Sequence, residues 1–186
     1  MNIIARPYGS DRCYCRPDTT LQKENRDLYC PDHVERISWA PVLFARIAKA
    51  GRFVGGKFAS RYYDGLNFGT LLYFHDSCHS DLAFTSCADH TSILPFPLYN
   101  PVVMENGKNS FVIRKDGEIL YTCQAEGVKA IEEAIIRASQ TTSLRIGDLI
   151  AVELSPVSNL ASRKDGDIRM DGVFCENDIF GFRIIF

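Results

Sequence analysis

ISWAPVLFARI at residues 37–47 and GLNFGTLLYF at residues 65–74 are two dense apolar runs in this chain of 186 residues. Polar residues bound each run, and runs of this kind are typical of strands buried on both faces. Gly51, Gly55 and Gly56 between them indicate a turn, and KFASRYYD at residues 57–64 suits a short helix. The stretch therefore predicts two core strands joined by a glycine-containing connection.

The flanking segments add further strands and one clear helix. Asp116-Gly117 is a strong hairpin signal between strands at residues 110–114 and 118–122. Residues 127–140 predict a helix, because Val128, Ile131, Ala134, Ile135 and Ala138 share one helical face. Other expected strands lie at residues 2–5, 93–99, 149–154, 167–170, 172–175 and 180–185, with a hairpin near Tyr29 and an irregular segment at 77–91. The pattern predicts a mainly β protein with a few helices, an α+β class.

Residues 1–33 differ from the rest of the chain in composition. They are polar and turn-rich, with breakers at Pro7, Gly9, Pro17 and Pro31. The apolar pattern begins near Arg36. We therefore expect an N-terminal lobe at 1–33 and a core domain at 34–186.

Composition narrows the class of protein. Hydrophobic residues make up 46% and charged residues 24%, as in ordinary globular proteins. The net charge is -2 and the basic residues are scattered, so we expect neither nucleic acid nor a membrane as partner. No signal peptide or membrane-spanning run stands out, which favours a cytoplasmic location. The odd number of cysteines, seven, favours free and mostly buried thiols over disulfides.

Several segments, in order, resemble bacterial members of the fumarylacetoacetate hydrolase (FAH) family. The matching segments are MNIIARPYG at 1–9, RPD at 16–18, YCP at 29–31, GR at 51–52, FASRYYD at 58–64 leading into 65–72, ASQ at 138–140, LRIGDLI at 144–150, KDGDI at 164–168 and the final strand. The resemblance implies an FAH-type mixed β-sandwich roll and a homodimer. It also implies an ancestry among acylpyruvate hydrolases and 2-hydroxyhepta-2,4-diene-1,7-dioate isomerases.

The resemblance also implies where a catalytic metal site would be. Family members hold Mg²⁺, Mn²⁺ or Ca²⁺ with a Glu-x-Glu pair on the first core strand and an Asp on the next, and a later Lys contacts substrate. Here the Glu positions fall on Ala40 and Val42, the Asp position on Leu71 and the Lys position near Thr85. Of the family's Thr-Ala-Arg-Asp, only Asp76 remains. Alkyl side chains cannot supply the oxygen ligands that these ions need.

These substitutions predict an FAH-fold protein without the family's metal-dependent reaction, a pseudoenzyme or a small-molecule-binding homologue. No cofactor is expected, and Mg²⁺ or Mn²⁺ would bind only if the family site were retained. An alternative is an active hydrolase or isomerase with relocated ligands, drawn from residues such as Glu35, Asp76 or Asp81.

A second alternative concerns the histidines and cysteines around residue 80. His75, Cys78, His79, Cys87 and His90 are of the types that bind zinc, and Cys87 with His79 or His90 could form a thiol–base pair. Against a zinc module, there is no C-x-x-C pair, and adjacent Cys78 and His79 would point apart in an extended segment. The competing interpretation is a loop with free thiols.

Overall fold

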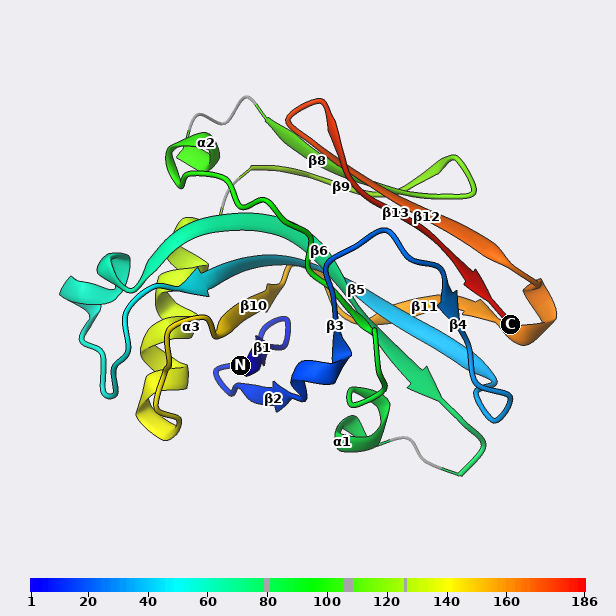
Figure 1. Cartoon of the computed structure of the whole chain (residues 1–186), viewed down its shortest axis with the longest axis horizontal. Coiled ribbons are helices and arrows are strands. Elements are labelled where there is room, and N and C mark those ends of the chain that lie inside the picture. The colour runs from blue at the N-terminus through cyan, green and yellow to red at the C-terminus, as the bar shows by residue number, and fades with distance from the viewer. Residues whose placement is uncertain (79–80, 106–108, 126) are drawn as a thin grey trace.

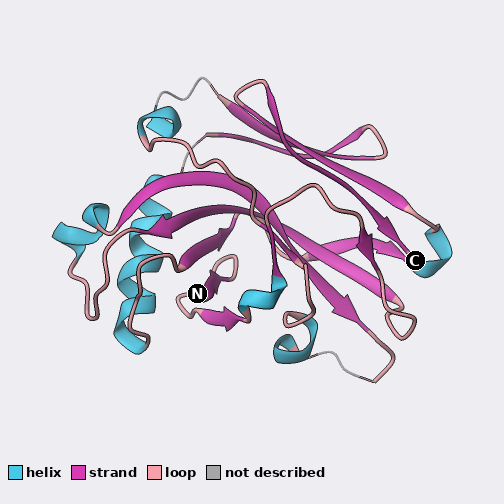
Figure 2. Ribbon diagram, viewed as in Figure 1, coloured by secondary structure: helices cyan, strands magenta, loops and turns pink. Residues whose placement is uncertain are grey.

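A computed structural model describes residues 1–78, 81–105, 109–125 and 127–186. In these residues strands dominate and form two sheets, with helices at the margins (Figures 1 and 2). The first sheet contains β1 (Ile3–Arg6), β2 (Tyr14–Arg16), β3 (Leu21–Gln22), β5 (Arg36–Ile47), β6 (Tyr63–His75), β7 (Ser92–Ile93), β10 (Leu149–Glu153) and β11 (Ser158–Ser162). The second contains β4 (Leu28–Tyr29), β8 (Ser110–Lys115), β9 (Glu118–Gln124), β12 (Ile168–Phe174) and β13 (Asn177–Ile185). The α-helices are α1 (Leu82–Thr85), α2 (Val102–Glu105) and α3 (Val128–Thr141), and 3-10 turns lie at Asp18–Thr20, Gly56–Arg61 and Arg163–Asp165.

The long antiparallel pair β5 and β6 forms the centre of the first sheet. The strand order is β2-β1-β10-β5-β6-β7-β3, and β11 also pairs with β5. Ala40 lies opposite Leu71 and Val42 opposite Gly69, while Val42 also lies opposite Glu153 on β10. The register therefore brings the middle of β5, part of β6 and the end of β10 together at one place.

One side of this sheet, the outer face, packs against the second sheet and α3. Phe68 of β6 stacks on Phe111 of β8, with ring centroids 4.5 Å apart, and meets the edge of Phe174 of β12 at 4.9 Å. The apolar stripe of α3, with Ile131 and Ile135 fully buried, joins the same core. Figure 1 shows the second sheet lying across the curved β5–β6 pair. Helix α3 lies toward the end of that pair where the 3-10 turn Gly56–Arg61 connects the two strands. Burial of these aromatic and aliphatic side chains is the main stabilising contribution.

The opposite side of the first sheet, the inner face, is lined by a separate apolar cluster. Because side chains alternate along a strand, Ala40, Val42 and Phe44 point away from the second sheet. The cluster consists of Ile3, Ala5, Ala40, Val42, Phe44, Leu71, Tyr73, Leu94, Leu149 and Ala151. Tyr14, Leu21, Phe96 and Leu98 pack against it, so the inner face is closed as well.

The main sequence predictions are confirmed. The protein is mainly β, the two apolar runs form β5 and β6, and the Asp116-Gly117 turn joins β8 to β9. Asp116 and Gly117 both have positive φ, 52° and 86°, as a two-residue hairpin requires. The predicted helix is α3, and the short helix expected at 57–64 is a 3-10 turn, Gly56–Arg61.

Four expectations were wrong. Of the strand expected at 93–99, only Ile93 lies in a strand, β7 (Ser92–Ile93), because Pro95 and Pro97 have no N–H to donate. The hairpin near Tyr29 is instead a short strand that pairs in parallel with β13. The two strands expected at 167–175 are one, β12. The seven cysteines are free, but only Cys30 is buried.

Residues 1–33 contribute strands to both sheets: β1 pairs with β10 and β4 with β13. Strand pairing thus crosses the boundary expected after residue 33, and the division of the chain into units stays a prediction. No helix among the described residues is long and apolar enough to cross a membrane. The cytoplasmic location and the homodimer also stay predictions.

Candidate functional site

The centre of the inner face is alkyl. Ala40, Val42 and Leu71 are all fully buried in the inner-face cluster, on two strands whose register places Ala40 beside Leu71. At Gly69, on the same face, an added Cβ would lie 2.3 Å from the carbonyl oxygen of Ile93. The absence of a side chain there lets the 93–94 backbone close over the sheet. This part of the face offers no oxygen donor from its side chains.

A buried polar group, which we call the Tyr73 cluster, adjoins these alkyl residues. It consists of Tyr14, Arg16, Tyr73 and Glu153, which come from β2, β6 and β10. The Tyr73 hydroxyl donates to Oε1 of Glu153 and lies 2.7 Å from the Tyr14 hydroxyl. The other carboxylate oxygen of Glu153 accepts the backbone N–H of Tyr8 at 3.0 Å. Both oxygens of this carboxyl group are therefore already in use.

Arg16 supplies the positive charge of the cluster and is only 1% exposed. Its Nη2 donates to the carbonyl oxygen of Leu72 at 2.9 Å and to the hydroxyl of Thr91 at 2.9 Å. The guanidinium carbon lies 5.1 Å from the centre of the Tyr73 ring, a cation–π contact. Its Nε and Nη1 are buried and make no hydrogen bond of acceptable geometry to the described residues. Arg16 and Glu153 thus share one buried site with Tyr73 between them.

Burial dominates the proton affinities of this cluster. It raises the pKa of Glu153, against the lowering effect of the hydrogen bonds from Tyr73 and Tyr8 and of the Arg16 charge. Burial also raises the pKa values of Tyr73 and Tyr14. The tyrosines therefore keep their protons and act as hydrogen-bond donors, which suits a structural network better than a general base.

Two further predicted site residues lie outside the inner-face cluster. Thr85 is buried on α1, and its hydroxyl donates to the carbonyl oxygen of Asp81 at 3.1 Å, within its own helical turn. Asp76 follows the end of β6, where its Oδ1 accepts the backbone N–H of Cys78 at 2.8 Å. The structure thus brings Ala40, Val42 and Leu71 together and leaves Thr85 and Asp76 apart from them.

Comparison with solved structures gives the fold. A fumarylpyruvate hydrolase from Pseudomonas aeruginosa, solved with Mn²⁺ and pyruvate, matches with a TM-score of 0.74 and 15% identity, over 99% of this chain and 96% of that one. A maleylpyruvate hydrolase from Sphingobium matches with 0.75 and 15%, over 99% and 70%. A 5-carboxymethyl-2-hydroxymuconate delta-isomerase from Mycobacterium smegmatis matches with 0.77 and 12%, over 99% and 78%. The chain has the fold of the fumarylacetoacetate hydrolase family. No protein-family model and no curated protein matches its sequence.

The residues of this FAH fold do not fit the divalent ion that the family implies. Such an ion needs several oxygen ligands at one place. The described residues contain no group of three His, Cys, Asp or Glu side chains that could hold a metal. Glu153 is the carboxylate of the Tyr73 cluster, and its oxygens are hydrogen-bonded to Tyr73 and Tyr8.

The described His and Cys residues near residue 80 lie on different segments, from the end of β6 to the turn after α1. His75 ends β6, its ring nitrogens are buried without a partner among the described residues, and burial with the Arg36 charge lowers its pKa. Cys78 is exposed, and His79 lies outside the described residues. Cys87 donates its thiol to the carbonyl oxygen of Phe84, and Cys87 and His90 line a cavity. The zinc site and the thiol–base pair stay predictions.

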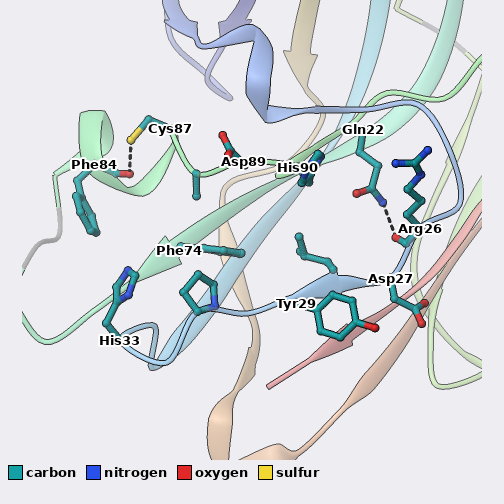
Figure 3. Close-up of a pocket in the computed structure, with 13 residues that line it drawn as sticks. Gln22, Arg26, Asp27, Tyr29, His33, Phe74, Phe84, Cys87, Asp89 and His90 are labelled. Atoms are coloured by element: carbon teal, nitrogen blue, oxygen red, sulfur yellow. Dashed lines mark hydrogen bonds between the residues drawn. The ribbon is translucent and has the colours of Figure 1, made fainter.

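That cavity is a candidate site that the sequence did not predict. It has a volume of about 610 Å³ and lies between the β3–β4 connection, the end of β6 and the α1 region (Figure 3). Its lining residues are Gln22, Arg26, Asp27, Leu28, Tyr29, Pro31, His33, Phe74, Phe84, Cys87, Ala88, Asp89 and His90. Of the lining residues, Cys87 and His90 had been singled out in the sequence. These residues meet Arg26 and Tyr29 through the parallel pairing of two-residue strands, and no local sequence pattern predicts that pairing.

Proposed function

We propose that this chain is a divergent FAH-family protein that does not catalyse the family's metal-dependent hydrolysis or isomerisation. The observation that carries the proposal is the alkyl centre of the inner face, where Ala40, Val42 and Leu71 meet. The sequence resemblance assigns the family's two glutamates and its aspartate to these positions. Ala40, Val42 and Leu71 lie close together on paired strands, as three ligands of one metal ion would have to.

The chemistry of the parent reaction supports the proposal. A divalent ion stabilises the negative charge that develops on a substrate carbonyl oxygen, and it must itself be held by oxygen donors. A cation placed among buried alkyl groups would lose its hydration without compensation. The neighbouring carboxyl of Glu153 is a single group, and it already accepts hydrogen bonds from Tyr73 and Tyr8.

The alternative of relocated ligands has little support from the positions of the candidate residues. Glu35 is exposed beside Arg36, and its backbone N–H bonds the carbonyl oxygen of His75. Asp81 caps α1 by accepting the backbone N–H of Phe84 at 3.0 Å. Asp76 is hydrogen-bonded to Cys78 in a turn. Asp76 and Asp81 therefore serve local structure through their side chains, and Glu35 is an exposed residue just before β5.

An activity assay tests the proposal. Purified protein is incubated with fumarylpyruvate, maleylpyruvate and 2-hydroxyhepta-2,4-diene-1,7-dioate, with Mg²⁺ or Mn²⁺ or with a chelator. We expect rates equal to those of buffer with the same metal. The Pseudomonas aeruginosa fumarylpyruvate hydrolase is the positive control, and circular dichroism checks that the tested sample is folded. Turnover that disappears with the chelator would contradict the proposal.

A further inference from the structure

The cavity of about 610 Å³ is separate from the inner face. Its floor contains Leu28 and Phe74, whose side chains belong to the outer-face core, while Ala40, Val42 and Leu71 belong to the inner-face cluster. The volume lies within the range of small-molecule sites, roughly 300–1,000 Å³. Gln22, Leu28, Tyr29, Phe74 and Phe84 come from strands and α1. The other lining residues, Arg26 among them, come from loops and turns.

The cavity has an apolar part suited to a flat ring system. Leu28 and Phe74 are each 3% exposed, and Pro31 and Ala88 complete the floor. Tyr29 lies beside this floor in Figure 3, and its residue exposure is 72%. No ring contact to another described residue involves Tyr29. An exposed tyrosine next to an apolar floor can stack on an aromatic ligand, because offset stacking and burial both favour the contact.

The polar groups of the cavity are concentrated at one end. Figure 3 shows Gln22, Arg26 and His90 together on one side, away from Phe84 and His33. The Nε2 of Gln22 donates to the backbone oxygen of Arg26 at 2.7 Å, which ties the two residues together. The side chain of His90 makes no hydrogen bond to the described residues, so its ring nitrogens can meet a ligand. This end therefore offers donors to a polar head group.

The charged residues that line the cavity are Arg26, Asp27 and Asp89, and Arg26 is the group that can bind an anion. Asp27 is already bound by Arg183, which donates to it from Nε at 3.0 Å, from Nη2 at 2.7 Å and from its backbone N–H at 3.0 Å. Within the described part of the chain Arg26 pairs with Glu24 alone, and both side chains are highly exposed, 73% and 68%. Exposed pairs contribute little, so the Arg26 guanidinium can exchange Glu24 for a carboxylate and bind both of its oxygens. Asp89 on the rim is exposed, so solvent and salt screen the repulsion between its carboxylate and an anionic ligand.

We propose that this cavity binds a flat aromatic carboxylic acid of one or two rings. The rings lie on Leu28, Pro31 and Phe74 and stack on Tyr29, and the carboxylate binds Arg26 next to Gln22 and His90. This site does not depend on the loss of the metal-dependent reaction, because it shares no residue with the inner face. Its failure or success leaves the proposed function untouched.

Binding of 2-naphthoate tests the site, with neutral 2-naphthamide and ringless acetate as controls. Calorimetry gives the affinities, and amide signals in nitrogen–proton correlation spectra report the location. We expect 2-naphthoate to shift signals of residues 26–33 and 84–90, and to bind about tenfold more tightly than 2-naphthamide, as a charge-assisted hydrogen bond implies. Acetate is expected to shift none of them at the same concentration.

Two variants separate the ring site from the charge site. Tyr29→Ala should weaken both naphthyl probes by roughly three- to tenfold, because it removes one stacking partner. Arg26→Gln should weaken only 2-naphthoate and bring it to the affinity of 2-naphthamide. Tyr8→Ala, which removes another exposed tyrosine away from the cavity, is the matched control and should change neither. Equal affinities of the two probes for the unmodified protein, shifts elsewhere, or no shifts would overturn the proposal.

Discussion

The two faces of the first sheet are built by alternating residues of the same strands, yet they are unlike in chemistry. On β6 the outer face presents Phe68, Leu72 and Phe74 to an apolar core. The inner face presents Leu71 and Tyr73, with the latter joined to Glu153 and stacked under Arg16. Packing alone explains the outer face. Buried charged groups add little net stability compared with apolar residues of the same size, so packing does not explain the inner face.

The difference teaches that the packing of the two sheets depends on one face, while the other face holds a buried polar group. The outer-face contacts, such as the stack of Phe68 on Phe111, determine how the two sheets sit together. The inner face determines what the sheet can bind. Substitutions in its two halves, the alkyl centre and the Tyr73 cluster, should have effects of different size.

Leu71→Asp should have the largest effect, because it places a carboxylate among fully buried alkyl groups. We expect a loss of at least about 4 kcal/mol in the free energy of unfolding at pH 7, measured by urea titration. Leu71→Asn introduces a side chain with the shape of aspartate but no charge. It is the matched control and should lose less free energy of unfolding. The gap between the two should narrow toward pH 4, where the introduced carboxyl group takes up a proton. Near-normal stability of Leu71→Asp would show that the alkyl centre is open to solvent.

Arg16→Met should come next, because it leaves Glu153 buried without a nearby cation. The Arg16 charge favours the ionised form of Glu153 without a direct salt bridge between these two described residues, so we expect a loss of up to about 3 kcal/mol, the low end of the range for a broken buried pair. The double variant Arg16→Met/Glu153→Gln should be less destabilised than the sum of the two single variants, because the uncompensated charge is gone. Strict additivity of the urea unfolding energies would mean that Arg16 and Glu153 do not interact.

Tyr73→Phe should have an intermediate effect, because Glu153 and the Tyr14 hydroxyl each lose a hydrogen-bond partner. An unsatisfied buried polar group costs about 1–3 kcal/mol. Tyr8→Phe removes an exposed hydroxyl and should stay within about 0.5 kcal/mol of the unmodified protein. If the two variants unfold at the same urea concentration, the Tyr73 hydroxyl does not hold the cluster together.

The pH dependence of stability should show the smallest effect. The raised pKa of Glu153 means that the folded state binds its proton more tightly than the unfolded state does. Its contribution is therefore complete below the ordinary glutamate pKa of about 4.5 and is lost as the pH rises through the folded-state pKa. Glu153→Gln removes this term, so the unmodified protein should lose stability relative to the variant between pH 4 and pH 7. A difference in unfolding free energy between the two proteins that is constant over this pH range would contradict the raised pKa of Glu153.

The sequence predicted the outer face well and the inner face only in part. Dense apolar runs located β5 and β6, helical periodicity located α3, and an Asp-Gly pair located the β8–β9 turn, because those signals are local. The strands β3, β4 and β7 span two residues each, too short to leave a periodic signal. Arg16, Tyr73 and Glu153 were not singled out, since they meet only through strand pairing of distant segments. The assignment of Ala40, Val42 and Leu71 to the family's metal-ligand positions came only from the family resemblance and stays a prediction.

Crystals of the protein grown with Mn²⁺ and measured for its anomalous scattering give the most direct test of the proposed loss of the metal site. The account predicts no anomalous peak beside Ala40, Val42 and Leu71, at Mn²⁺ concentrations that occupy the Pseudomonas aeruginosa fumarylpyruvate hydrolase. A peak there with carboxylate ligands would contradict it.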